Sequence, residues 1–128
     1  MRTLALAVLL AISTPTLAVA GPPDQVKLAQ GRVDTAATIY TLTLARWQSG
    51  QGTLEEVTAW SLRWLGALRD QPTRGKALKR ALAEHRDRLT AVEATARDRV
   101  KAGLASAIEV EAAHYFLVEA ELWVARGK

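Results

Sequence analysis

The sequence predicts an all-α protein, an antiparallel four-helix arrangement made of two helical hairpins and preceded by a signal peptide. Three observations predict this fold. Apolar residues recur every three or four positions through four segments, glycine and proline separate those segments, and one pattern around a glycine occurs twice. The chain has 128 residues, 49% of them hydrophobic, which suits one small domain. It has no cysteine, which excludes disulfide scaffolds, cysteine-bound zinc, iron–sulfur clusters and thiol nucleophiles.

Residues 1–20 have the features of a signal peptide. Arg2 supplies the positive start, residues 4–12 are an uninterrupted apolar run, and residues 18–20 read Ala-Val-Ala, a small-residue cleavage pattern. The run is shorter than the roughly 20 residues that a membrane-spanning helix needs. We therefore expect cleavage after Ala20, which leaves 16 basic and 13 acidic residues, a formal charge of +3, and a periplasmic or secreted protein. Residues 21–128 would form a single helical domain, with hairpin repeats at about 24–70 and 74–126.

The first hairpin is predicted from its start and stop signals. Pro23 is typical of a first helical position, and a helix from there would end at the turn formed by Gly50 and Gly52. Thr53 with Glu56 three residues later is a capping-box pattern, in which each side chain binds the other residue's backbone amide. The second helix should therefore begin near residue 54 and stop before residue 72, which is proline.

The second hairpin shows the same signals. A third helix follows the turn at residues 71–75, and Gly103 should end it in the left-handed conformation that glycine adopts readily. Ser106 and Glu109 form a second capping-box pattern at the start of the fourth helix. An offset of 53 residues aligns this hairpin with the first one, Gly50 with Gly103 and Thr53 with Ser106. The repeat indicates one supersecondary unit used twice, with chance agreement between two alanine-rich helices as the alternative.

The segment from Val100 to Ala112 reads VKAGLASAIEVEA and is followed by Leu117, Ala120 and Leu122. With this pattern, residues 98–126 resemble the helical hairpin repeat of the outer-membrane efflux protein (TolC-like) family. Residues 46–68 are a weaker second copy. The resemblance implies a small exported bacterial protein built from capped hairpins. It does not extend to conduction, because the chain has no alternating segment of the roughly ten residues that a barrel strand requires.

No motif predicts catalysis, a cofactor or a metal centre. The nucleotide-binding and nucleophile-elbow patterns are absent, and the two histidines, His85 and His114, are not spaced as ligands of one metal. We therefore expect a protein that is not an enzyme and has no cofactor. The basic segment 74–101 could contact an anionic membrane surface, with a solvated helix face of mixed charge as the alternative. No feature indicates nucleic-acid binding.

The tryptophans and the fourth helix suggest an interaction protein. Trp60 and Trp64 lie four residues apart on one helix face, where they would either fill the core or form a contact surface. The fourth helix is apolar on more than one side, and Leu117 and Val124 are its candidate contact residues. We predict a non-enzymatic module that binds a second copy or a helical envelope protein through this helix, with Trp60 and Trp64 as a secondary contact. The alternative is a periplasmic binding protein for a small ligand, a metal or an exposed polypeptide.

Overall fold

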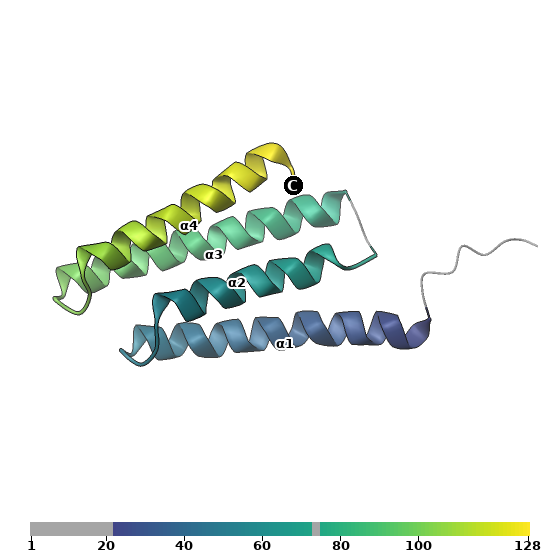
Figure 1. Ribbon diagram of the computed structural model, residues 1–128, viewed down its shortest axis with the longest axis horizontal. Helices are drawn as coiled ribbons and strands as arrows, with labels where there is room; N and C mark the ends of the chain where they lie inside the picture. Colours follow the sequence, from purple (N-terminus) through teal and green to yellow (C-terminus); the bar gives the residue numbers. More distant parts are fainter. Residues whose placement is uncertain (1–21, 73–74) are drawn as a thin grey trace, which may run out of the picture.

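The computed structural model describes residues 22–72 and 75–128, and the predicted signal peptide lies outside this part of the chain. The described residues form four helices: α1 (Pro23–Gln48), α2 (Leu54–Arg69), α3 (Lys76–Lys101) and α4 (Ala107–Arg126). Helix α1 packs against α2 and α3 against α4, which confirms the all-α prediction of two helical hairpins (Figure 1). Within the described residues, no helix combines the length and apolar character needed to cross a membrane.

Both hairpin turns adopt the same glycine-dependent geometry. Gly50 and Gly103 have φ values of +85° and +72°, the left-handed region that side chains with a Cβ rarely enter. After α1, the Gln51 amide donates to the Arg46 carbonyl at 2.7 Å, and after α3, the Leu104 amide donates to the Arg99 carbonyl at 2.8 Å. These bonds define Schellman motifs, which satisfy carbonyls left open at a helix end. The predicted turns at these two glycines are thus confirmed.

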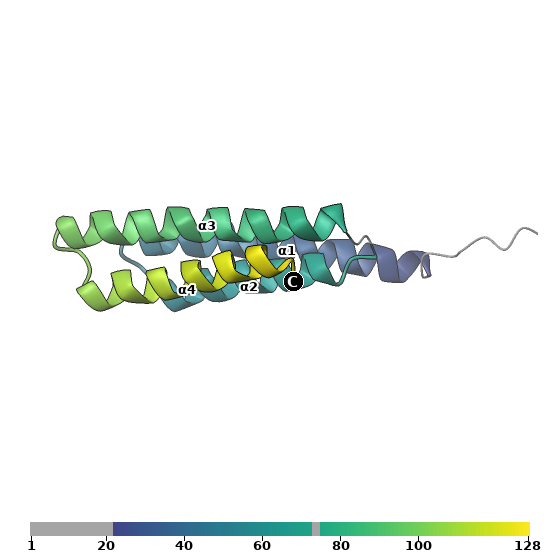
Figure 2. The ribbon, with the colours of Figure 1, turned by 90° about the horizontal axis from the view of Figure 1, so that it is seen from above.

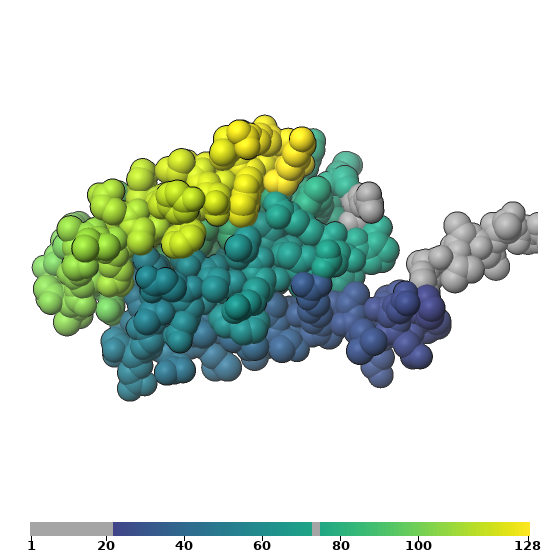
Figure 3. All heavy atoms as spheres, in the orientation of Figure 1, coloured from purple at the N-terminus to yellow at the C-terminus, as the bar shows by residue number. Residues whose placement is uncertain are grey.

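The four helices form a staggered row rather than a closed ring. Helix α2 packs against α3 and joins the two hairpins, whereas α2 and α4 meet over a short length and no comparable packing joins α1 to α4 in the described part of the chain. Figure 1 shows α2 and α3 in the middle of the row and α1 and α4 at its edges, and Figure 2 shows the stagger, with α3 on one side and α2 and α4 on the other. In the space-filling view, α1 and α4 form the two long edges of the face (Figure 3). Each edge helix therefore has one side without a neighbour.

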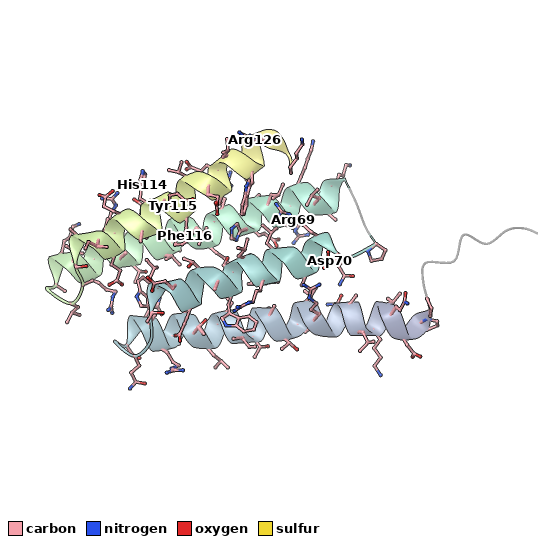
Figure 4. All side chains as sticks on the ribbon, viewed as in Figure 1. Arg69, Asp70, His114, Tyr115, Phe116 and Arg126 are labelled. Carbon is pink, nitrogen blue, oxygen red and sulfur yellow. The ribbon has the colours of Figure 1, made fainter. Side chains whose placement is uncertain are left out.

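The hydrophobic core follows the middle of this row. The largest fully buried apolar side chains come from the end of α1 and from the facing sides of α2 and α3: Trp47, Val57, Leu65, Leu82 and Val92. Helix α4 adds a line of small and aliphatic residues that packs against α3. At the open end of the first hairpin, Arg32 of α1 forms an ion pair with Asp70. Asp70 follows α2 and is labelled in Figure 4. Both side chains are exposed, so we expect this pair to contribute little to stability.

Candidate interaction surface

The first predicted capping box is present at the start of α2. The Thr53 hydroxyl accepts a hydrogen bond from the Glu56 amide at 3.2 Å, and the Glu56 carboxylate accepts one from the Thr53 amide at 3.4 Å. Gly52 leaves room for this arrangement, because a Cβ there would lie 3.0 Å from Glu56 Oε2. The capping box fixes the point at which the chain leaves the turn and enters α2.

The second predicted capping box is wrong. Ser106 does occupy the N-cap position of α4, with extended backbone angles, but its side chain makes no capping hydrogen bond. The Glu109 carboxylate does not return to the Ser106 amide. It accepts a hydrogen bond from the indole nitrogen of Trp47 at 2.6 Å, and it lies 3.5 Å from Arg99 Nε. The carboxylate therefore joins α4 to the end of α1 in the other hairpin.

Arg99 completes this contact between the hairpins. Its guanidinium donates to the Trp47 carbonyl at 3.0 Å and to the Leu104 carbonyl at 3.3 Å, and it lies 5.2 Å from the centre of the Trp47 ring. We call Trp47, Arg99 and Glu109 the junction. Sequence reasoning missed it because Trp47 and Glu109 are 62 residues apart and their pattern matched a local cap.

A second polar contact joins α2 to α3 near the middle of the row. Ser61 Oγ and His85 Nδ1 are 2.8 Å apart, and Arg88 Nε donates to the same oxygen at 2.9 Å. Burial, followed by the nearby charges of Arg88 and Arg69, lowers the pKa of His85 from 6.5 to about 4. Ser61 is fully buried and His85 is 2% exposed. This serine–histidine pair therefore lacks the access and the basicity that a nucleophile and its base need, and we interpret it as a core contact.

The tryptophans predicted as a secondary contact lie partly inside the protein. Trp64 packs 5.8 Å from the Tyr40 ring, and the Arg88 guanidinium covers its face at 4.0 Å. Trp60 lies beneath Arg63, whose guanidinium is 4.6 Å from the ring centre. Both rings pack against the core and are half-buried. Trp64 thus contributes mainly to the contact between α1, α2 and α3, whereas Trp60 borders a groove described below.

Helix α4 has an inner face that packs against the other helices. Leu117 is 9% exposed and lies in a core cluster with Leu89 of α3, and Val124 is half-buried against Leu65 and Leu82. The prediction that Leu117 and Val124 contact a partner is therefore corrected, because the core of this chain covers Leu117 and most of Val124. The inner face consists of Val110, Ala113, Leu117, Ala120 and Val124.

The opposite side of α4 carries a second apolar line. Its large members are exposed, with fractions of 79% for Ile108, 64% for Tyr115, 45% for Val118 and 43% for Leu122. Tyr115 is labelled on this edge helix in Figure 4. The outer α4 line occupies alternating steps of three and four residues, the spacing of a coiled-coil seam. It comprises Ile108, Glu111, Tyr115, Val118, Leu122 and Ala125.

A long surface groove lies at the other edge of the row, along α1. Its volume is about 1000 Å³ and Trp60 and Arg63 of α2 form one wall. The other wall belongs to α1 and contains small and charged residues as well as one exposed leucine: Asp24, Lys27, Leu28, Gly31, Arg32, Thr35 and Ala36. The groove is therefore mainly apolar, with several cations on its rim.

Comparison of the chain with known protein-family models, with curated proteins and with solved structures found no match. The resemblance to efflux-protein hairpins thus stays a prediction from the sequence motif. Among the described residues, no three histidine, aspartate or glutamate side chains are grouped so that they could hold a metal ion. The surface features that remain are the outer α4 line and the groove along α1.

Proposed function

We propose that this protein is an exported, non-enzymatic helical interaction module that docks a helix of its partner on the outer α4 line. The observation that carries the proposal is the arrangement of apolar residues on α4. One line faces the core, and a second line of four large apolar side chains faces away from it. A helix at the edge of the fold needs only one apolar line to pack against its neighbours, so the second line of α4 has no partner within the described part of this chain.

The spacing of these residues distinguishes the outer α4 line from ordinary surface exposure. Single exposed apolar residues are common on soluble proteins and need no explanation. Here Ile108, Tyr115 and Leu122 are seven residues apart, and Val118 occupies the position between the last two. A helix that packs alongside would bury all four side chains in one seam, which is the geometry of a two-stranded coiled coil.

The charges of α4 indicate the chemistry of the partner helix. Residues 107–126 contain four glutamates and one arginine. Glu109 turns inward to the junction, and Glu119 is half-buried at the cleft between α2 and α4. Glu111 and Glu121 are exposed and, with Glu119, give the docking helix an acidic surface. Charges beside a coiled-coil seam select the partner. We expect the partner helix to carry an apolar seam with lysine or arginine beside it. A second copy and a helical envelope protein are the two sources of such a helix that the predicted export permits.

The cleft between α2 and α4 gives little support to the alternative of a small-ligand site. A cleft of about 210 Å³ between α2 and α4 is lined by Leu62, His85, Leu89 and Phe116 among others. Ligand pockets usually measure about 300–1,000 Å³ and combine an apolar wall with a few converging polar groups. The cleft is smaller than that range, and Nδ1 of His85 is already within hydrogen-bond distance of Ser61 Oγ.

Binding of designed helical peptides tests this proposal. The probe is a peptide of about 18 residues with leucine at the seam positions and lysine beside them, and the control peptide has glutamate in place of lysine. We expect the lysine peptide to bind the full exported protein in a fluorescence anisotropy titration. The Tyr115→Arg/Leu122→Arg variant should bind it at least about tenfold more weakly, since two seam positions become cationic.

A matched variant controls for the added positive charge. Thr90→Arg adds a cation at an exposed position on α3, outside both edge helices, so it should leave peptide binding at α4 unchanged. Equal binding of the lysine peptide to the wild type and the Tyr115→Arg/Leu122→Arg variant would contradict docking on the outer α4 line. Equal binding of the lysine and glutamate peptides would contradict the role of the glutamates.

A further inference from the structure

The outer side of α1 carries a line that matches the outer α4 line in length. Its two leucines are exposed, with fractions of 73% for Leu28 and 59% for Leu42. The line follows alternating steps of three and four residues, and every member is exposed: Leu28, Gly31, Thr35, Thr38, Leu42 and Ala45. Both lines span 18 residues, 28–45 and 108–125, or about 27 Å at 1.5 Å per helical residue.

The positions of these two helices allow the row to continue from one molecule to the next. Helices α1 and α4 are the two edges of the row, and successive helices run in opposite directions (Figures 1 and 2). Helix α4 of one copy placed beside α1 of another would extend the antiparallel alternation by one more pair. This contact uses two different surfaces, so one copy can bind a neighbour at each edge.

Side-chain sizes on the two lines are complementary in this antiparallel alignment. When residue 108 lies opposite residue 45, Tyr115 lies opposite Thr38 and Leu122 lies opposite Gly31. At the other end, Leu28 lies opposite Ala125. In these pairs a large side chain of one helix meets a small residue of the other, which lets the two helix backbones approach closely. The exception is Leu42, which lies opposite the charged Glu111.

The charges and the groove favour the same pairing. Helix α1 contains Lys27, Arg32 and Arg46 against Asp24 and Asp34, a formal charge of +1, and Arg32 also pairs with Asp70. Helix α4, with four glutamates and one arginine, has the opposite sign. The groove of about 1000 Å³ runs beside the α1 line, with Arg63 and Trp60 on its far wall. A helix seated on α1 would lie in this groove. Trp60, predicted from the sequence as a contact residue, is then positioned to touch it.

From these observations we infer that the helix docked on α4 is α1 of a second copy of this chain. This inference rests on the proposed function and specifies its partner. The contact is heterologous, α4 of one molecule on the α1 line of the next, and it produces a ring or a filament according to whether the rotation between copies closes.

Two variants that each block one edge test the inference. Leu28→Glu/Leu42→Glu places carboxylates on the α1 line, facing the acidic α4 of a neighbour. Tyr115→Arg/Leu122→Arg places cations on the outer α4 line, facing the basic α1 of a neighbour. In size-exclusion chromatography with light scattering, we expect the wild type to show a mass that rises with concentration beyond that of a dimer. Each variant alone should be a monomer, and an equimolar mixture should form a one-to-one heterodimer, because each variant keeps one open edge.

The outcomes distinguish this inference from the proposed function. If Leu28→Glu/Leu42→Glu still self-associates while Tyr115→Arg/Leu122→Arg does not, α4 pairs with α4, and the assignment to α1 is overturned. A wild type that stays monomeric also overturns the inference. In both cases the lysine peptide still reports whether α4 docks a helix. All four substituted side chains are exposed, and circular dichroism checks that the variants keep their helicity. If a double variant unfolds, the single variant Leu42→Glu replaces it for the α1 line and Tyr115→Arg replaces it for the outer α4 line.

Discussion

The two hairpin turns share sequence spacing and backbone geometry but differ in how they use one glutamate. Glu56 bonds locally to Thr53 and completes a cap at the start of α2. Glu109 has the matching position in the second hairpin, yet it bonds to Trp47 and Arg99. The same motif therefore produces a contact within one hairpin in the first case and a contact between hairpins in the second.

The choice between these two uses follows from the available donors. The indole nitrogen of Trp47 belongs to a side chain that is 1% exposed, so an unpaired donor there would be costly. The Ser106 amide lies at the surface, where water can accept its hydrogen bond. Arg99 adds a positive charge beside the carboxylate. A capping pattern thus predicts where a helix begins, but the surroundings decide whether the side chains close the cap.

Removing the junction should have the largest effect on stability. Trp47→Ala leaves a cavity and removes the donor to Glu109, so we expect the free energy of unfolding to fall by about 3–5 kcal/mol. Trp60→Ala is the matched control, because it removes the same side chain from a half-buried position. It should cost clearly less in urea denaturation. Equal losses would contradict the importance of the contact between hairpins.

A lower pH should weaken the contact between Ser61 of α2 and His85 of α3, which also joins the two hairpins. His85 has a pKa of about 4 in the folded protein against an ordinary value of 6.5 in the unfolded chain, so the unfolded state binds more protons between these values. Stability should therefore fall as the pH falls from about 6.5 to about 4, by roughly 3 kcal/mol in total from this group. Denaturation at several pH values measures the slope. His85→Leu should flatten the slope of the free energy of unfolding against pH above pH 4.5. An unchanged slope in this variant would show that other groups cause the pH dependence.

Glutamate removal compares the two hairpins directly. Glu109→Ala leaves the buried indole donor of Trp47 without its acceptor, and we expect a loss of about 1–3 kcal/mol. Glu56→Ala exposes an amide at the surface, so its loss should be below about 1 kcal/mol. Both variants are measured by urea denaturation under the same conditions. A larger loss for Glu56→Ala would contradict the different roles of these carboxylates.

Removing the cap hydroxyls should change the stability least. Here the loss should be larger in the first hairpin than in the second, the reverse of the order expected for the glutamates. Thr53→Ala removes a hydrogen-bond acceptor for the Glu56 amide and should cost about 1 kcal/mol. Ser106→Ala removes a hydroxyl that makes no capping bond, so its cost should stay within about 0.5 kcal/mol. Thermal unfolding of the two variants provides the comparison. Equal losses would indicate that a capping box forms in solution at both turns.

The sequence predicted the helices and turns well because their signals are local. Pro23, Gly50 and Gly103 act through backbone geometry within a few residues, and the structure places each where the pattern indicated. The junction was not predictable in this way. It depends on Trp47 and Glu109 coming together across the two hairpins, and no local spacing encodes their contact.

Helix periodicity also left open which apolar line of α4 faces the core. Leu117 and Tyr115 belong to lines on opposite sides, and both lines repeat with steps of three and four residues. The inner line contains Ala113 and Ala120, which allow close approach to α3, whereas the outer line contains the bulky Tyr115 and the charged Glu111. Small residues at a helix contact are a usable signal, and here they would have favoured the arrangement that the structure shows.

Cysteine cross-linking tests the central claim most directly, because the chain has no cysteine of its own. In the proposed contact, Thr35 of one copy lies opposite Val118 of the next. Oxidation of mixed Thr35→Cys and Val118→Cys proteins should therefore give a disulfide-linked heterodimer, and each variant alone should give little product. Thr90→Cys, at an exposed position on α3, measures random collisions. A strong homodimer of Val118→Cys, or no product above the Thr90→Cys level in the mixture, would contradict the pairing of α4 with α1.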